Sequence, residues 1–272
     1  MSLFEGQVAW VTGAGRGIGR ATALLLAAQG AAVALVSRTQ SEVEQVAQEI
    51  RLRGGKAIAS LLDVSQWDMV QWTAQQIEAA LGPIDLLVNN AGVLEPLGKL
   101  WETDPEQAGR LFDINLTGAY YCMRAALPGM VQRGRGVVVN LSSGAAMSTS
   151  PNFSVYAASK AGLDHLTRNA AVDLKGTGVR IYSLYPALVE TRMQEMLRAA
   201  TPERLPPERR QFYIKQKEMG QVLAPELPAR VITWLCSADC DVVSGAVINL
   251  QNQPELLAKI NRDWDQSIAH HA

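Results

Sequence analysis

Residues 11–21 read VTGAGRGIGRA, an apolar strand end followed by a glycine-rich turn and the start of a helix. Gly13, Gly17 and Gly19 let the backbone turn tightly. The helix N-terminus after them offers unpaired N–H groups to an anion such as a pyrophosphate. The spacing GxxxGxG differs from the GxGxxG of many dinucleotide-binding proteins, so alone it indicates only a strand–turn–helix unit. Its place in the first such unit of the chain favours dinucleotide binding.

Short β-branched runs alternate with longer helical stretches along the rest of the chain. Near-continuous apolar strands separated by helices indicate a parallel sheet covered on both faces. We find no repeat, linker or low-complexity tract, so we predict one α/β domain over 1–272, Rossmann-like and doubly wound, with about seven parallel strands. The predicted strands are 7–13, 31–37, 56–64, 84–92, 136–143, 179–186 and 246–250, and the predicted helices are 17–29, 41–52, 66–81, 104–132, 154–175 and 226–237.

Residues 188–224 break this alternation with three prolines and many charges. Ligands of open α/β sheets bind outside the carboxyl ends of the strands, so an insertion after a strand predicts a lid over a substrate. A surface excursion without a role is the alternative. Residues 192–218 contain seven basic residues and four glutamates, and this net positive charge favours an anionic substrate. The alternative is that these residues lie on solvent-exposed faces of helices and bind nothing. Residues 251–272 are predicted to form a C-terminal tail.

Composition excludes several classes of function. The 25 Lys and Arg residues balance 26 Asp and Glu, so the net charge of -1 provides no basic field for nucleic acid. Cys122, Cys236 and Cys240 form no CxxC pair and indicate reduced thiols. No uncharged run has the length and composition of a membrane span, and the three histidines match no metal spacing. We expect a cytoplasmic protein without a metal, a nucleic-acid partner or a membrane partner.

The end of the second predicted strand bears on the choice of dinucleotide. An acidic residue there accepts hydrogen bonds from a free adenosine ribose. Ser37 and Arg38 stand there instead, and Arg16 lies within the glycine-rich turn. Two guanidiniums clamp a 2′-phosphate that a carboxylate repels. Two solvated arginines are the alternative, but the missing carboxylate together with both arginines favours NADP(H) over NAD.

A second stretch, VYAASKAG at 155–162, sets a phenol beside an ammonium. Tyr156 and Lys160 are four residues apart and therefore lie on one face of a helix, one turn from each other. Either they are ordinary residues of an amphipathic helix, or the lysine changes the acidity of the tyrosine.

Five elements together resemble the short-chain dehydrogenase/reductase family, in that family's order across residues 5–250: TGAGRGIG (12–19), NNAG (89–92), Asn115 in DINLTG, Ser143 and YAASK (156–160). The resemblance implies hydride transfer between a nicotinamide and a carbonyl or alcohol, and we expect an NADPH-dependent ketone or aldehyde reductase. A 3-ketoacyl-carrier-protein reductase is one alternative, which the absence of that group's usual Asp-Gly-Gly ending disfavours. A non-catalytic NADP(H)-binding regulator is the other, disfavoured because all four family residues are present.

The resemblance also implies the roles of these four residues. Tyr156 is the general acid and base, and Ser143 orients the carbonyl, with Ser142 as the competing candidate. Lys160 holds the nicotinamide ribose, and Asn115 anchors a water beside it. Lowering the pKa of a tyrosine from about 10 to neutrality needs about 4 kcal/mol. An ammonium about 4 Å away supplies about that much at an effective dielectric of about 20, so we expect Lys160 to lower the pKa of Tyr156.

The cofactor is expected to contact the glycine-rich turn and the ends of the strands. For Asp63, a helix N-cap is the alternative role. The family usually has glycine at the position of Ala187, so the resemblance does not determine the backbone conformation at this position. The resemblance implies a homodimer or homotetramer built partly on helices 104–132 and 154–175. The expected cofactor-binding residues are Gly13, Gly15, Arg16, Gly17, Ile18, Gly19, Ser37, Arg38, Asp63, Val64, Asn90, Ala91, Gly92, Tyr156, Lys160, Pro186, Ala187, Val189 and Thr191.

Overall fold

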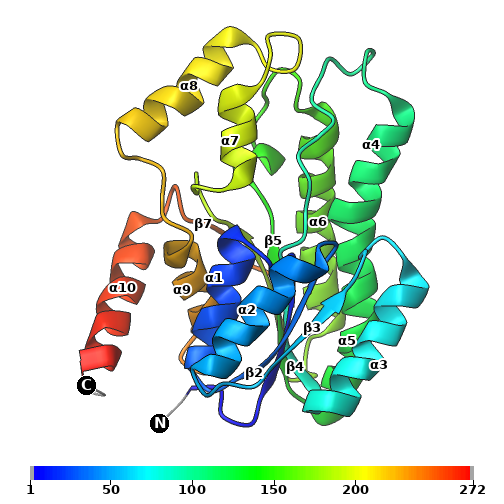
Figure 1. The fold of residues 1–272 in the computed structure, drawn as a ribbon, viewed down its shortest axis with the longest axis vertical. Helices are drawn as coiled ribbons and strands as arrows, with labels where there is room; N and C mark the ends of the chain where they lie inside the picture. Colours follow the sequence, from blue (N-terminus) through cyan, green and yellow to red (C-terminus); the bar gives the residue numbers. More distant parts are fainter. Residues whose placement is uncertain (1–2, 270–272) are drawn as a thin grey trace.

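All seven predicted strands form, and they lie side by side in one parallel sheet. The computed structural model describes residues 3–269 (Figure 1). The strand order is β3-β2-β1-β4-β5-β6-β7, and every neighbouring pair is parallel. This confirms the predicted Rossmann-like α/β class. The strands are β1 (Val8–Thr12), β2 (Ala32–Ser37), β3 (Ala57–Leu61), β4 (Ile84–Asn89), β5 (Gly136–Leu141), β6 (Val179–Tyr185) and β7 (Val247–Asn249).

Successive strand side chains point to opposite faces of the sheet, and helices bury both faces. In β1, Ala9 and Val11 join a core with α1 (Gly17–Ala28), α2 (Gln40–Leu52), α9 (Glu226–Cys236) and α10 (Pro254–Ala269). Val8 and Trp10 join the opposite core with α3 (Trp67–Leu81), α5 (Gly118–Arg133) and α6 (Ser154–Asp173). Burial on both faces explains why the strands are apolar at nearly every position.

The predicted helix over 104–132 is not continuous. Asp104 caps α4 (Pro105–Phe112) by accepting a hydrogen bond from the Gln107 backbone N–H at 2.8 Å. A π-helical turn, η1 (Asp113–Thr117), then separates α4 from α5. Within this turn the Asn115 amide bonds both to the backbone N–H and to the carbonyl of Val93, each at 2.8 Å. These tertiary hydrogen bonds occur where the helix changes from α-helical to π-helical geometry, a change that the sequence periodicity did not reveal.

Residues 188–224 contain two helices, α7 (Arg192–Ala199) and α8 (Pro207–Glu218), above the carboxyl ends of the strands (Figure 1). The two ends of this segment meet, because Leu223 donates to the carbonyl of Leu188 at 2.8 Å and accepts from Glu190 at 2.9 Å. The segment is therefore closed at its base. The expected C-terminal tail is largely helix α10, which packs against α9, while residues 270–272 lie outside the described range.

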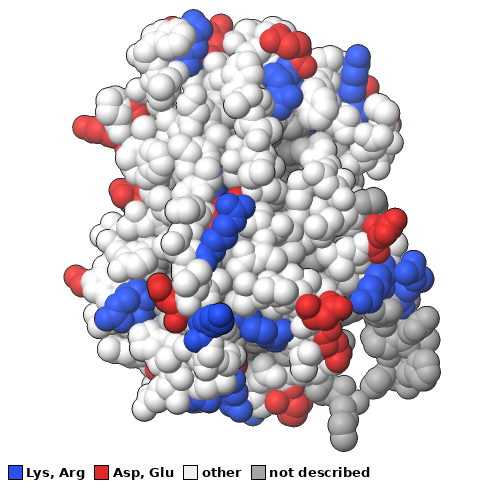
Figure 2. Space-filling model, turned by 180° about the vertical axis from the view of Figure 1, so that it is seen from behind, with Lys and Arg blue, Asp and Glu red and all other residues white. Residues whose placement is uncertain are grey.

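Acidic and basic side chains alternate over the face seen from behind (Figure 2). None of the helices within residues 3–269 is both long and apolar enough to cross a membrane. In the same range, no three His, Cys, Asp or Glu side chains are arranged to hold a metal ion. Cys122, Cys236 and Cys240 are free thiols.

Candidate active site

A cavity of about 1110 Å³ extends along the carboxyl ends of the strands and under α7 and α8. It includes the point between β1 and β4 where the strand order reverses, which is where ligands of open α/β sheets bind. Every predicted site residue lines this cavity except Gly19 and Asn115. Residues from segments far apart in the sequence are thus brought to one place.

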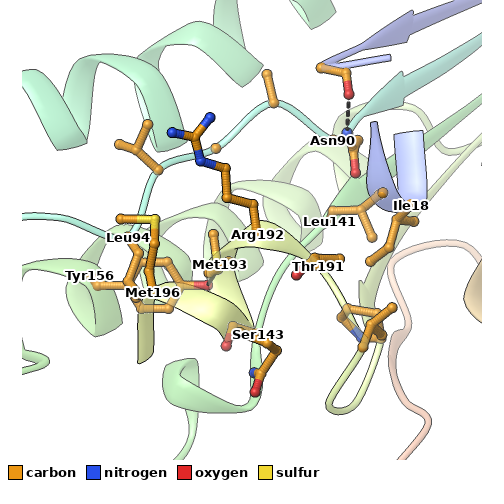
Figure 3. A pocket seen from close by; sticks show the side chains of 18 of the residues that line it. Ile18, Asn90, Leu94, Leu141, Ser143, Tyr156, Thr191, Arg192, Met193 and Met196 are labelled. Atoms are coloured by element: carbon orange, nitrogen blue, oxygen red, sulfur yellow. Dashed lines mark hydrogen bonds between the residues drawn. The ribbon is translucent and has the colours of Figure 1, made fainter. Parts of the chain in front are cut away.

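Hydrogen bonds join the glycine-rich turn to the end of β4. The Asn90 amide donates to the carbonyls of Thr12 and Gly13, at 2.9 and 3.0 Å. Figure 3 shows a hydrogen bond at Asn90 as a dashed line. The Thr12 hydroxyl accepts from the backbone N–H groups of Asn90 and Ala91. A Cβ on Gly19 would lie 2.4 Å from both the Asn90 amide nitrogen and the Gly13 carbonyl oxygen. Gly19 therefore lets α1 approach the turn from beneath and does not line the cavity.

The N-terminus of α1 is suited to an anion. The helix has no side-chain cap and no acidic residue in its first turn. Gly13 and Gly17 have φ values of 63° and 54°, a left-handed conformation that favours glycine. The N–H groups of the first turn, which have no partner in the helix itself, therefore form a cradle that fits a pyrophosphate.

Two arginines and one glutamate lie around the glycine-rich turn and the end of β2. Arg38 lines the cavity and has no ion-pair partner within residues 3–269. Arg16 is paired with Glu42 at 3.2 Å, and a Cβ on Gly15 would lie 2.8 Å from the Glu42 carboxylate. Glu42 was not among the predicted site residues, because a glutamate in the first turn of a helix is common and carries no distinguishing pattern.

Asp63 lines the cavity and is held in place before α3. Its carboxylate accepts hydrogen bonds from the backbone N–H and the hydroxyl of Ser65 and pairs with Arg110. Burial by itself raises the pKa of Asp63, but these hydrogen bonds outweigh it and the pKa is lowered. The N-cap position of α3 is occupied by Gln66, so the alternative N-cap role for Asp63 is wrong.

Tyr156 lies on α6 and projects into the cavity beneath α7. Figure 3 shows Tyr156, Ser143, Met193 and Met196 gathered in one part of the pocket, with Ile18 and Asn90 in another. The Tyr156 hydroxyl lies 4.0 Å from the Met193 sulfur. Burial raises the pKa of Tyr156, and a smaller opposite effect comes from the Ser143 hydroxyl. The phenol is therefore protonated at neutral pH.

Lys160 lies one turn further along α6 and is buried. Its ammonium donates to the carbonyl of Leu141 at 2.8 Å. Burial lowers the pKa of Lys160 to about 8, and the nearby Asp164 carboxylate opposes this. The expected lowering of the Tyr156 pKa by Lys160 is wrong for this structure, because desolvation of the phenol dominates. Ser142, the competing candidate to Ser143, points toward the Lys160 carbonyl at 3.4 Å.

Asn115 lies behind the cavity wall and beside Lys160. Its amide nitrogen also donates to the Ser159 hydroxyl at 3.2 Å, in addition to the two bonds with Val93. A Cβ on Gly92 would lie 3.3 Å from the Asn115 oxygen and 3.5 Å from the Lys160 ammonium. The two side chains therefore flank Gly92, and Asn115 holds the loop after β4.

The segment after β6 follows a glycine-like path. Ala187 has a φ of 63°, the left-handed conformation in which a side chain is strained. Ala187 therefore adopts the backbone conformation expected of a glycine, which the resemblance did not determine. Thr191 lies against the glycine-rich turn, since a Cβ on Gly17 would be 3.2 Å from its methyl group.

The wall around Tyr156 is apolar and comes mostly from residues that no motif predicted. Val93 and Leu94 follow β4, Leu111 lies on α4, and Ala145 and Phe153 lie between β5 and α6. Five further residues lie in the 188–224 segment, whose sequence has no pattern of its own. The cavity-lining members of this cluster are Val93, Leu94, Leu111, Ala145, Phe153, Tyr156, Leu188, Met193, Leu197, Phe212 and Tyr213.

The fold and the site define a nicotinamide-dependent oxidoreductase of the Rossmann type. A family model described as short chain dehydrogenase matches residues 7–202. The chain belongs to the short-chain dehydrogenase/reductase family, whose members act on CH–OH and C=O groups with NAD or NADP.

Relatives and solved structures agree with this membership. The chain is 36% identical over 245 residues to the cis-4-hydroxycyclohexanecarboxylate dehydrogenase of Sinomonas cyclohexanicum, covering 90% of this chain and 95% of that protein. It is 31% identical over 246 residues to the 3-oxoacyl-(acyl-carrier-protein) reductase FabG of Thermotoga maritima, covering 90% and 96%. The crystal structure of NAD+-bound xylitol dehydrogenase superposes with a TM-score of 0.83 at 27% identity, covering 91% and 98%.

Proposed function

We propose that this protein is an NADP(H)-dependent carbonyl reductase that interconverts a small ketone or aldehyde with its alcohol. The observation that carries the proposal is the meeting of Ser143, Tyr156 and Lys160 in a cavity that continues to the glycine-rich turn. An enzyme needs the reacting groups and the cofactor cradle in one enclosed space, because orientation supplies much of the rate.

In the direction of reduction, the Tyr156 phenol gives its proton to the carbonyl oxygen. The raised pKa of Tyr156 keeps this proton on the phenol at neutral pH. The Ser143 hydroxyl donates a hydrogen bond to the same oxygen and fixes the carbonyl against the phenol. Lys160 stabilises the phenolate that remains after the transfer. The nicotinamide, when bound, supplies the hydride.

The residues of the cavity fit a dinucleotide. The uncapped first turn of α1 would hold the pyrophosphate, and Thr191 would lie near the nicotinamide amide. Arg38 and Arg16 would hold a 2′-phosphate, and Arg38 needs to break no existing ion pair to do so. This support for NADP(H) comes from the chain's own charges.

Residues 188–224 act as the lid of this site in our proposal. Met193 and Leu197 on α7 and Phe212 and Tyr213 on α8 cover Tyr156 with apolar surface. Such a cover excludes water from the reacting groups. In the complex, the substrate carbonyl would take the place of the Met193 sulfur beside the phenol, which requires the Met193 side chain to move.

Two alternatives are less well supported. FabG of Thermotoga maritima is a relative, but this chain lacks the Asp-Gly-Gly ending of carrier-protein reductases. A non-catalytic regulator needs no acid, yet Asn115, Ser143, Tyr156 and Lys160 are all present. The free thiols are consistent with a cytoplasmic protein, which we also propose.

The Tyr156→Phe variant tests the proposal. The variant removes the transferable proton and keeps the ring packing against Phe153, so we expect turnover to fall at least about 1,000-fold while NADPH binding stays within about threefold. The measurements are ketone reduction followed at the NADPH absorbance and a fluorescence titration with NADPH. Retained turnover would rule out Tyr156 as the acid, and NADPH binding without oxidation by any carbonyl compound in wild type would favour the regulator.

A further inference from the structure

The basic residues of the lid separate into two groups. Arg198 and Lys217 both pair with Glu190, and Arg204 pairs with Glu95. These three cations share two carboxylates of the protein, which offset most of their charge. They therefore provide little attraction for an anionic ligand. The number of basic residues in 192–218 consequently overstates the positive charge that lines the cavity.

Arg192 and Arg209 are the two lid cations that line the cavity. Within residues 3–269 neither has a carboxylate partner. Figure 3 shows Arg192 projecting into the pocket from the start of α7. Arg192 is exposed, whereas Arg209 is partly buried in the apolar part of the site. Of the four lid cations without a carboxylate partner in residues 3–269, Arg192 and Arg209 line the cavity, whereas Arg210 and Lys215 do not.

Arg209 is held in a fixed position by two aromatic rings. Its guanidinium carbon lies 5.2 Å from the centre of the Phe212 ring and 5.7 Å from that of Tyr213. Its Nε is buried and has no hydrogen-bond acceptor. A buried donor without a partner is unfavourable, so the protein leaves part of the hydrogen-bonding capacity of this guanidinium unsatisfied.

The same aromatic pair connects Arg209 to the reacting phenol. Tyr213 is buried in one apolar cluster with Tyr156 and Leu197. The phenols of Tyr156 and Tyr213 also interact electrostatically, and Arg209 opposes the effect of burial on the pKa of Tyr213. Arg209 therefore stands one side chain beyond Tyr156, at the far end of an apolar wall.

We propose that Arg209 binds a carboxylate of the substrate, so that the enzyme acts on an oxo acid or hydroxy acid with an apolar body between its two polar ends. The inference rests on the proposed function and names its substrate class. The planar guanidinium fork matches a carboxylate in two parallel hydrogen bonds. The apolar body lies against Leu197, Phe212 and Tyr213, while the carbonyl meets Ser143 and Tyr156.

A carrier-protein substrate fits this arrangement less well. An acidic carrier protein docks on exposed cations around the entrance, but Arg198, Arg204 and Lys217 are already paired with glutamates. Among the lid cations of residues 3–269 that have no carboxylate partner, Arg209 is the one that is partly buried in the apolar part of the cavity, where a small carboxylate fits better than a protein surface.

The test compares two unreactive ligands of the same shape, cyclohexanecarboxylate and cyclohexanecarboxamide. Each is titrated calorimetrically into the full-length protein in the presence of saturating NADPH and, separately, NADH. We expect wild type to bind the carboxylate about 10- to 100-fold more tightly than the amide, because a hydrogen bond to a charged group is worth about 1.5–3 kcal/mol. Arg209→Met is expected to remove this preference. Lys215→Met, which removes an exposed cation of α8 outside the cavity, is expected to keep it.

Wild type that binds the amide as tightly as the carboxylate overturns the proposal, whatever the variants do. So does Arg209→Met that keeps the full preference. Reduction of 4-oxocyclohexanecarboxylate and its amide is measured separately with wild type. Carboxylate preference in binding without reduction of either ketone would retain the Arg209 subsite and reject the proposed reductase activity. A fold check by circular dichroism accompanies each variant.

Discussion

At the scale of single residues, burial has a larger effect on the site than neighbouring charge. Tyr156 and Lys160 lie one turn apart, yet the pKa of the phenol is raised, because desolvation opposes ionisation. The same desolvation lowers the pKa of Lys160 to about 8. Both shifts favour the neutral forms, which is what removal from water predicts for an acid and a base alike.

The Lys160 pKa makes stability depend on pH. Between pH 8 and about 10.5 the unfolded lysine holds a proton that the folded one has lost, so the free energy of unfolding rises with pH in this window, by about 3 kcal/mol in total. Below pH 8 both forms are protonated and the contribution is constant. Urea unfolding of wild type and Lys160→Met at several pH values measures the difference. Parallel curves would contradict the prediction, and Lys175→Met, an exposed lysine, serves as the control.

Arg38 decides the preference for NADPH in our proposal. Removing its guanidinium with Arg38→Ala is expected to weaken NADPH binding by about 10- to 100-fold, since one charge-assisted contact to the 2′-phosphate is lost. NADH lacks that phosphate and is expected to bind almost as before. Fluorescence titrations with both dinucleotides give the two affinities. Equal losses would show that Arg38 does not read the phosphate, and Arg53→Ala at the exposed end of α2 is the control.

At the scale of elements, the π-helical turn η1 positions the loop after β4. Asn115 replaces the backbone partners that Val93 lacks in this loop, with two hydrogen bonds of 2.8 Å. The loop also includes Asn90 and Gly92, which line the cavity. A change of helical pitch thus supports the cofactor cradle from behind, in keeping with the frequent occurrence of π-turns at functional sites.

The Asn115→Ala variant measures this support. It leaves the N–H and the carbonyl of Val93 without their side-chain partners, so we expect a loss of about 2–3 kcal/mol in the free energy of unfolding and weaker cofactor binding. Urea unfolding and dinucleotide titration provide the two values. Asn169→Ala is the control, since that exposed amide only bonds to the His165 carbonyl on the surface of α6. Similar losses in the two variants would argue against a specific role for the turn.

At the scale of the whole molecule, the order of the strands brings the residues of the site together. The outer helices α5 and α6 leave apolar side chains exposed on the surface of the single chain. The side chains of Tyr120 and Val131 on α5 and Val172 on α6 are exposed by 46%, 40% and 73%. Apolar side chains on neighbouring helices favour association with a further copy of the chain. They support our proposal of a homodimer or homotetramer.

Light scattering tests this proposal directly. We expect a mass two or four times the 29.4 kDa of the chain, and we expect Tyr120→Asp combined with Val172→Asp to lower it. The charges would have to be buried without partners in the interface. Leu52→Glu, which changes an exposed apolar residue of α2, is expected to leave the mass unchanged. A monomeric wild type would refute the assembly.

The sequence by itself determined the fold class, because each strand and helix carries its own periodicity and Gly13 and Gly17 mark the first turn by local backbone requirements. The resemblance of its motifs to the short-chain dehydrogenase/reductase family also pointed to Ser143, Tyr156 and Lys160 as candidates. The sequence did not reveal the break of the helix at Asn115, which depends on hydrogen bonds to Val93 in a distant loop. The sequence marked 188–224 as a candidate lid, but it did not show which of its side chains face the cavity, because Met193 and Arg209 acquire their roles only where α7 and α8 cover the sheet.

Only the tertiary structure decided the direction of the Tyr156 pKa and which lid cations face the cavity. Both depend on what surrounds a charge in space: Arg198 and Arg209 look alike in the sequence, but one meets a glutamate and the other meets two aromatic rings. Periodicity describes an element along the chain, whereas desolvation and ion pairing are set by residues that the fold brings in from elsewhere.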